Sequence, residues 1–219
     1  MLISHSHNFI FFHVAKTGGL SVRDALLPFA TEPEHFKIVR PAREIQGQPN
    51  PVYEMWQTLL LHARADDARR ALPPETFQQY FKFAFVRNPW DWHVSMYHFI
   101  LREPDHTRYA LVRALGSFDA FIHWVVNTSN PYPKGATKFQ LDALCDKNRQ
   151  LLVDAVGRYE SLEEDFQRFC RQLGLQLTLP HLNRSAHTAY QAYYTPETRD
   201  LLGRCFNEDI QTFGYSFGG

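Results

Sequence analysis

The sequence is poor in cysteine and has no long apolar run. Its three cysteines, Cys145, Cys170 and Cys205, are far apart and form no CxxC pair. This odd, scattered set excludes a disulfide framework or a zinc knuckle and favours a reducing compartment. The apolar run at residues 9–14 is too short for a signal-peptide core or a bilayer span. We therefore expect a cytoplasmic protein without a membrane span.

The sequence also lacks net charge, because 23 Lys and Arg balance 23 Asp and Glu. A broad polyanion-binding surface, such as one for nucleic acid, is therefore not expected, and any anion site must be built locally. The hydrophobic fraction of 44% excludes a disordered chain. The length fits a single domain over residues 1–219. The scattered histidines give no metal-ligand spacing, so we expect no metal.

Short apolar runs alternate with segments of helical periodicity along the chain. The pattern predicts buried strands over residues 9–14, 81–86 and 151–159, and helices from Ser21 onward and over residues 65–72, 90–101, 117–126 and 196–213. Ser161 begins a further helix with a capping-box pattern. Residues 31–58 are predicted to be mainly loop. This alternation indicates an α/β fold of three layers, P-loop-like, with a central parallel sheet flanked by helices.

A glycine turn follows the first predicted strand and opens a helix. Backbone N–H groups at such a helix start form a cradle for phosphate or sulfate. Lys16 adds a positive charge, Thr17 and Ser21 add hydroxyls, and Gly18 and Gly19 let a ligand approach the backbone. The Walker pattern GxxxxGK[ST] is absent. An ordinary strand-to-helix turn with a surface lysine remains the alternative.

The second predicted strand ends in Arg87, at the start of a helix that carries Ser95 two turns later. Ligands of parallel α/β sheets bind at the carboxyl ends of the strands. Arginine offers a bidentate fork to a phosphate, whereas a P-loop NTPase would close this strand with an Asp that holds Mg²⁺. The pattern favours phosphate binding without a dedicated metal ligand. A structural arginine that caps the loop is the alternative.

Three segments in this order resemble the PAPS-dependent sulfotransferases, where PAPS is 3′-phosphoadenosine 5′-phosphosulfate. They are residues 12–21 (FHVAKTGGLS), which resemble the 5′-phosphosulfate loop, residues 85–97 (FVRNPWDWHVSMY), which resemble the 3′-phosphate motif, and residues 157–166 (GRYESLEEDF). The likeness covers nearly the whole chain and points to the branch with carbohydrate sulfotransferases and many bacterial relatives. The chain departs from the family pattern at Ala15, Leu20 and Trp92, where Pro, Thr and Arg are usual.

The resemblance implies transfer of a sulfuryl group from PAPS to the hydroxyl of a saccharide or other small acceptor, with PAP, the 3′,5′-bisphosphate, as product. Lys16 would then neutralise the leaving 5′-phosphate, and Arg87 with Ser95 would bind the 3′-phosphate. The cofactor-binding residues implied in this way are Lys16, Thr17, Gly18, Gly19, Leu20, Ser21, Arg87, Ser95, Arg184 and Ser185.

The acceptor hydroxyl needs a general base, and His62 is our candidate for it. His62 lies between the two phosphate motifs in LHARA, which resembles the family's HATA segment. A helix-capping or buried structural histidine is the alternative. Residues 31–58 and 102–140 are expected to contact the acceptor, and the zero net charge argues against a long sulfated polyanion in that role.

Two other functions stay open at this point. One is a nucleotide kinase-like phosphoryl transferase, against which the missing Walker pattern and Mg²⁺ carboxylate count. The other is a non-catalytic nucleotide-binding protein, in which the histidine base would be dispensable.

Overall fold

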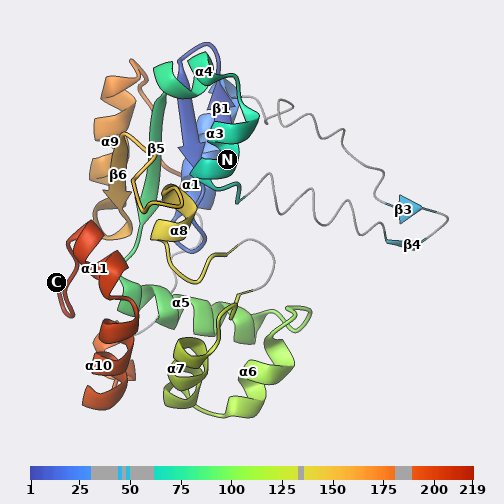
Figure 1. Cartoon of the computed structure of the whole chain (residues 1–219), viewed down its shortest axis with the longest axis vertical. Helices are drawn as coiled ribbons and strands as arrows, with labels where there is room; N and C mark the ends of the chain where they lie inside the picture. The colour runs from blue at the N-terminus through green and yellow to red at the C-terminus, as the bar shows by residue number, and fades with distance from the viewer. Residues whose placement is uncertain (31–43, 46–47, 50–61, 133–135, 181–188) are drawn as a thin grey trace.

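The structure, a computed structural model, describes residues 1–30, 44–45, 48–49, 62–132, 136–180 and 189–219. Figure 1 shows its elements in chain order. They are β1 (Leu2–Ser4), β2 (Phe9–Phe12), α1 (Gly19–Leu26), the 3-10 helix η1 (Leu27–Phe29), β3 (Glu44–Ile45), β4 (Gln48–Pro49), α3 (Ala65–Ala71), α4 (Pro74–Gln79), β5 (Phe81–Val86), α5 (Pro89–Arg102), α6 (Tyr109–Leu115), α7 (Phe118–Asn127), α8 (Leu141–Leu144), β6 (Ala155–Arg158), the 3-10 helix η3 (Tyr159–Ser161), α9 (Leu162–Gln172), the 3-10 helix η4 (Tyr190–Tyr193), α10 (Pro196–Cys205) and α11 (Asn207–Phe213).

A four-stranded sheet in the order β1-β2-β5-β6 forms the centre of the molecule. β5 pairs in parallel with β2 on one side and β6 on the other, with Phe12 opposite Ala84 and Val86 opposite Arg158. The apolar runs that predicted β2 and β5 are buried along almost their whole length, as expected of central parallel strands. The α/β fold is therefore confirmed. The sheet is mixed rather than purely parallel, because β1 folds back antiparallel onto β2.

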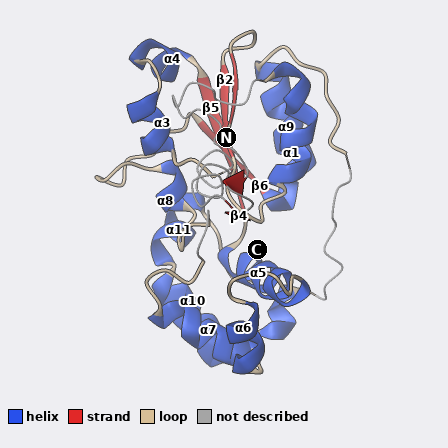
Figure 2. Cartoon of the chain, turned by 90° about the vertical axis from the view of Figure 1, so that its right-hand side faces the viewer, coloured by secondary structure: helices blue, strands red, loops and turns tan. Residues whose placement is uncertain are grey.

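Helices cover both faces of this sheet, as Figure 2 shows. Alternate strand residues point to opposite faces, so Ile10 and Phe12 pack with α3, α4 and α8, whereas Phe9 and Phe11 pack with α1 and α9. The two phosphate-motif loops leave the sheet at the carboxyl ends of β2 and β5, between these helical layers.

A second apolar cluster lies beyond the carboxyl ends of the strands, where α5 packs with α6, α7 and α10 (Figure 1). The Trp92 and Phe121 side chains are buried in it. The amphipathic pattern of α7 and its N-cap explain its bounds, because the Ser117 hydroxyl accepts a hydrogen bond from the Ala120 amide at 3.2 Å. This cluster fixes the direction in which α5 runs away from the sheet.

The structure corrects three local predictions. The third strand is shorter than residues 151–159 because the Leu152 amide bonds the Leu144 carbonyl instead of the sheet. The helix over residues 196–213 is broken at Phe206, whose backbone leaves the helical region and whose ring packs on His93. Ser161 makes no capping bond to the backbone; its hydroxyl donates to Asp165.

The described helices have two further features. Pro73 and Pro74 follow the end of α3, and Pro74 begins α4, because proline fits the first turn of a helix. None of the described helices is long and apolar enough to cross a membrane.

We predict that Gly157→Ala destabilises the fold by about 1–3 kcal/mol. A Cβ at this buried position in β6 would lie 2.5 Å from Cε1 of Phe85 and 3.1 Å from Cβ of Asp165. The added methyl group therefore forces side chains apart in a packed core. The midpoint of urea unfolding should fall at unchanged slope, and an unchanged midpoint would contradict the packing described here.

Candidate functional site

The loop between β2 and α1 has the backbone shape of an anion cradle. Lys16 and Gly18 both lie in the left-handed region, at φ 63° and 76°. The Thr17 hydroxyl donates to the Val14 carbonyl at 2.9 Å and closes the turn from inside. Left-handed residues in such a loop turn successive N–H groups toward one concavity, and the first amides of α1 continue that set. The loop can therefore hold an anion by its backbone.

The two glycines of the loop pack against protein. A Cβ on Gly18 would lie 2.5 Å from Cδ2 of Leu162, and a Cβ on Gly19 would overlap the His13 ring. Their small size thus brings the loop into contact with α9 and with the residue that follows β2. This packing role adds to the predicted one, and the close approach of a ligand to the backbone of these glycines stays a prediction.

Arg87 lies at the carboxyl end of β5, and its side chain is 3% exposed. Its Nε donates to the Asp91 carboxylate at 2.7 Å, in the i,i+4 spacing of a helix pair. Its guanidinium lies over the Tyr159 ring, 4.0 Å from the centroid. A buried guanidinium held by a carboxylate and an aromatic face keeps one orientation, which suits recognition of a fixed anionic group.

The two loops are joined directly. Arg87 Nη1 donates to the Lys16 carbonyl at 3.3 Å, and Trp92 Nε1 donates to the Ala15 carbonyl at 2.7 Å. Ala15 and Trp92 are two of the three departures from the family pattern, and here they contact each other. The buried indole of Trp92 thus anchors the entry of the first loop to α5.

One stripe of α5 connects the two cations. Asp91, Ser95 and Phe99 follow each other at i,i+4 spacing, so they lie on one face of the helix. Asp91 binds Arg87 at one end, and the Lys16 ammonium lies 4.4 Å from the Phe99 ring centroid at the other. Ser95 is buried between them along the stripe. Two turns of helix, about 12 Å, therefore separate the two contacts.

The ammonium group of Lys16 is desolvated and surrounded by positive charge. Burial, together with the nearby cations Arg102 and Arg87, lowers the pKa of Lys16 to about 8, while Glu103 opposes this shift. A bound anion would reverse this repulsion. The site is thus electrostatically prepared for a negative ligand.

His62 contacts the segment that leads into the first loop. Its Nδ1 donates to the His13 carbonyl at 3.0 Å, and the two imidazole rings are 5.0 Å apart. A carbonyl only accepts, so Nδ1 carries the proton and neutral His62 has its lone pair on Nε2. Burial lowers the pKa of His62 below its usual value, so the ring is neutral at pH 7.

The remaining predicted site residues are Leu20, Ser21, Arg184 and Ser185. Ser21 is buried in the first turn of α1, and Leu20 is 52% exposed there. Arg184 and Ser185 lie outside the described residues. Among the described residues, no group of three or more His, Cys, Asp and Glu is arranged to hold a metal ion.

Sequence reasoning missed two residues that shape the site, Phe99 and Tyr159. Asp91 had a readable signal, because it follows Arg87 at i,i+4 spacing in a predicted helix. The ring of Tyr159 comes from the end of β6, and only the parallel pairing of β5 with β6 brings it under Arg87.

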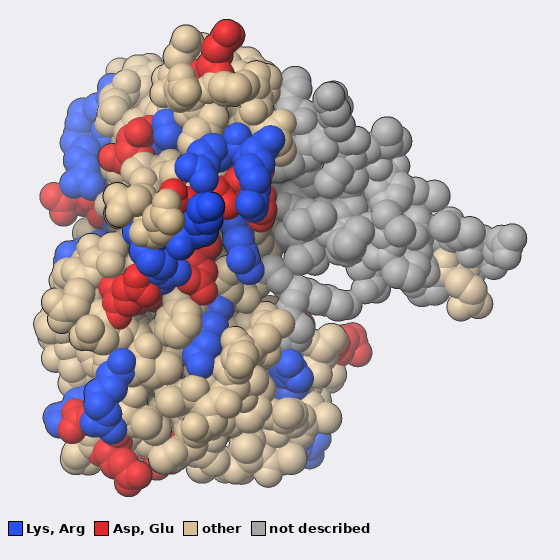
Figure 3. Space-filling view, in the orientation of Figure 1, with Lys and Arg blue, Asp and Glu red and all other residues tan. Residues whose placement is uncertain are grey.

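Away from these loops, acidic and basic side chains are mixed. Figure 3 shows Lys and Arg beside Asp and Glu around α3 and α8. Asp66 there pairs with Arg69 at 2.6 Å and with Arg70 at 3.0 Å, and Arg149 pairs with Glu208 at 2.6 Å. On this face, positive charge is thus locally compensated.

The comparisons with known proteins agree with this geometry. The model of a family described as the sulfotransferase family matches residues 1–216. The chain belongs to the sulfotransferase family. This sulfotransferase-family chain is also 29% identical over 126 residues to an uncharacterized protein of Archaeoglobus fulgidus, a match that covers 56% of this chain and 92% of that protein. Family membership supports sulfuryl transfer to an acceptor, from a sulfate donor as co-substrate.

We predict that anion binding at the first loop takes up a proton near pH 8 and weakens as the pH rises further. Lys16 has a pKa of about 8 without ligand, and an anion raises it by favouring the charged ammonium. Affinity for adenosine 3′,5′-bisphosphate should fall up to about tenfold per pH unit above pH 8.

Titration calorimetry in buffers of different ionisation enthalpy measures this proton uptake. Lys16→Arg keeps its charge throughout this range, so it should bind without the uptake. Equal proton uptake by the native protein and by Lys16→Arg would contradict the assignment.

Proposed function

We propose that this protein transfers the sulfuryl group of PAPS to the hydroxyl of a saccharide or other small acceptor. The observation that carries the proposal is the pair of cations, Lys16 and Arg87, held at two ends of one helix stripe and joined through the Lys16 carbonyl. A ligand with two separated anionic groups fits such a pair. PAPS has a 5′-phosphosulfate and a 3′-phosphate, and the family uses a sulfate donor.

The donor groups of the site match the two ends of that ligand. The first loop offers backbone amides, the Lys16 ammonium and the start of α1, which suit a phosphosulfate. Arg87 offers a planar fork in a fixed orientation, with the Ser95 hydroxyl next along the stripe, which suits a terminal phosphate. Bound PAPS supplies an activated sulfuryl group on a phosphate leaving group.

Lys16 is the residue that would stabilise the leaving phosphate. The ammonium is mobile on its stem and now lies over Phe99, so it can turn toward an anion in the loop. Charge that develops on the phosphate oxygen is stabilised best by donors already aimed there, in a desolvated site. The amides of residues 17–21 would hold the remaining oxygens. Positioning and charge compensation are the main needs of such a transfer.

His62 is the proposed general base. Its Nδ1–H bond to the His13 carbonyl leaves Nε2 as the basic nitrogen, and its lowered pKa keeps it neutral at pH 7. An imidazole in this state can accept the proton of an acceptor hydroxyl. The carbonyl bond is then stronger in the imidazolium, so it also stabilises the protonated form.

The acceptor class follows from the charge distribution. On the face shown in Figure 3, paired charges surround α3 and α8, and no single-sign groove appears among the coloured residues. A small neutral or weakly charged hydroxyl compound suits this surface better than a long polyanion. We propose that the protein works in the cytoplasm on such an acceptor, within the branch that sulfates carbohydrates, and not on nucleic acid.

The first test combines binding and turnover. We expect the native protein to bind adenosine 3′,5′-bisphosphate more tightly than adenosine 5′-monophosphate, and to release that bisphosphate from PAPS when an acceptor mixture is added. Arg87→Ala should lose at least about tenfold in affinity for the bisphosphate and little for the monophosphate, because it removes a charge-assisted fork.

Lys16→Ala should bind the bisphosphate yet lower the turnover of labelled PAPS by about 10²–10³. Tighter binding of ATP than of the bisphosphate, with phosphoryl transfer, would instead establish the kinase alternative. Bisphosphate binding without turnover, over a broad acceptor screen, would leave a nucleotide-binding protein.

The pH dependence of kcat/KM, which reports the pKa of the free enzyme, tests His62. A base must be unprotonated, and the pKa of His62 is lowered, so activity should be full at pH 7 and fall with acid through a pKa below 6.5. His62→Asn should lower kcat by about 10²–10⁴ and remove this acid limb. His98 lies on α5 and hydrogen-bonds the hydroxyl of Tyr193 from η4. The control variant His98→Gln should therefore keep the fall of activity in acid. An unchanged limb in His62→Asn would reject the assignment.

A further inference from the structure

The backbone of Arg87 is held by a side chain from a distant segment. The Arg87 amide donates to Gln140 Oε1 at 2.9 Å, and Gln140 Nε2 donates back to the Arg87 carbonyl at 2.7 Å. A glutamine amide has the same donor and acceptor as a peptide group, so Gln140 bonds Arg87 as a neighbouring strand would.

This clamp lies where regular structure ends. β5 ends at Val86 and α5 begins at Pro89, so Arg87 and Asn88 belong to neither the strand nor the helix. The next amide, that of Asn88, donates to the Glu160 carboxylate at 2.7 Å. Side chains therefore hold the backbone of this turn, and the backbone determines the position from which the Arg87 side chain extends.

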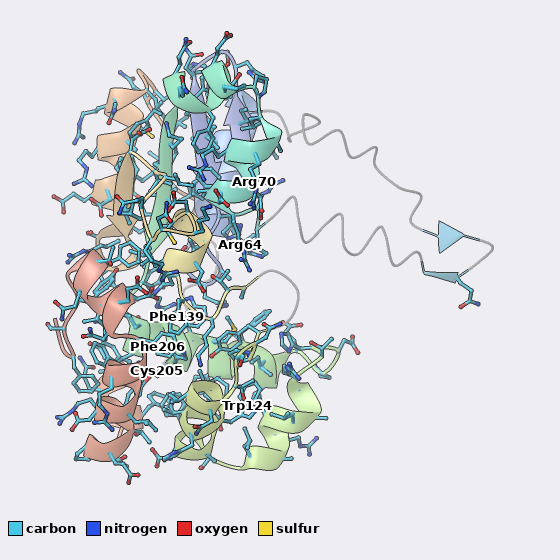
Figure 4. The ribbon with its side chains drawn as sticks, in the orientation of Figure 1. Arg64, Arg70, Trp124, Phe139, Cys205 and Phe206 are labelled. Carbon is cyan, nitrogen blue, oxygen red and sulfur yellow. The ribbon has the colours of Figure 1, made fainter. Side chains whose placement is uncertain are left out.

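Gln140 is itself anchored from the C-terminal helices. The Asp209 carboxylate accepts the amides of Gln140 at 2.8 Å and Leu141 at 3.0 Å, and so caps the start of α8. Gln140 and Asp209 are 2% and 1% exposed. The ring of the preceding Phe139 packs on Phe206, with the two ring centroids 5.0 Å apart. Both residues are labelled in Figure 4. Because its own backbone is held by Asp209, the Gln140 side chain can hold the Arg87 backbone in a fixed position.

We propose that Gln140 is a positioning residue for Arg87, which fixes the guanidinium for the 3′-phosphate, and that Asp209 holds Gln140 in register for this task. The inference rests on the proposed function of Arg87. Gln140 touches neither end of the ligand in this account; it acts through Arg87.

The position of Gln140 distinguishes this role from general stability. Gln167 also donates a side-chain bond to the backbone of another segment, to the Leu177 carbonyl at 2.6 Å, but from α9 on the opposite face of the sheet. Gln167 is only partly buried and makes one such backbone bond, whereas the buried Gln140 makes two, so Gln167→Met controls for the type of substitution. Only the loss of Gln140 should change which phosphate the protein recognises.

The experiment compares the affinities of adenosine 3′,5′-bisphosphate and adenosine 5′-monophosphate by calorimetry. In Gln140→Met, similar in size but without the amide, the ratio of the two affinities should fall at least about fivefold towards that of Arg87→Ala, with the monophosphate affinity within about twofold of native. The double variant Gln140→Met/Arg87→Ala should have the same affinity ratio as Arg87→Ala alone, because Gln140 acts only through Arg87 and has no further effect once the guanidinium is removed. Gln167→Met should keep the native ratio, and KM for PAPS should rise in Gln140→Met more than kcat falls.

The outcomes separate the two proposals. A native protein that binds both nucleotides equally would reject the role of Arg87 in the proposed function. A native preference that survives in folded Gln140→Met, or an equal loss for both nucleotides, would overturn the role of Gln140 alone. Should Gln140→Met fail to fold, Asp209→Asn keeps Gln140 and weakens only its anchor, because one of the two carboxylate acceptors for the Gln140 and Leu141 amides becomes an amide donor. Its ratio should also fall, and a native ratio there would overturn the inference.

Discussion

The parallel pairing of β2 with β5 is the constraint on which the rest of the site depends. It brings the chain out of both strands at the same edge of the sheet, although Lys16 and Arg87 are 71 residues apart. The buried apolar runs of the two strands enforce this pairing, since a slip of one residue would turn each strand's side chains to the wrong layer. Burial of the core thus brings the two loops that carry the candidate site into contact.

A neutral protein can build a strongly positive site only by concentrating charge. Here Arg102 and Arg87 lower the pKa of Lys16 in a partly desolvated region, although Glu103 opposes them and Arg87 is itself paired with Asp91. Desolvation strengthens both the repulsion between these cations without ligand and their attraction to an anion. In the proposed function, part of the affinity for an anion would come from the relief of this repulsion.

Much of the fold and the location of the candidate site could be predicted from local patterns. Continuous apolar runs indicated β2 and β5, and the rule that ligands bind at the carboxyl ends of parallel strands predicted that the two motifs would meet. The roles given to Lys16, His62 and Arg87 stay predictions.

What could not be predicted depends on contacts between distant segments. The amide of Gln140 meets Arg87 only because Asp209 holds the intervening segment, and no spacing in the sequence encodes that. The break at Phe206 is of the same kind, since its ring is drawn into a core shared with His93. The short β1 had too few residues to show a period, and its pairing with β2 made the sheet mixed.

If Lys16 has the role proposed for it, its left-handed backbone makes this loop a compromise between folding and function. A residue with a Cβ at φ 63° costs about 1 kcal/mol that glycine would avoid. Selection for thermal stability alone, in a library or in consensus design, would therefore enrich Lys16→Gly, and with it variants without the loop's cation. Engineering of this scaffold should hold position 16 fixed and look for stability elsewhere.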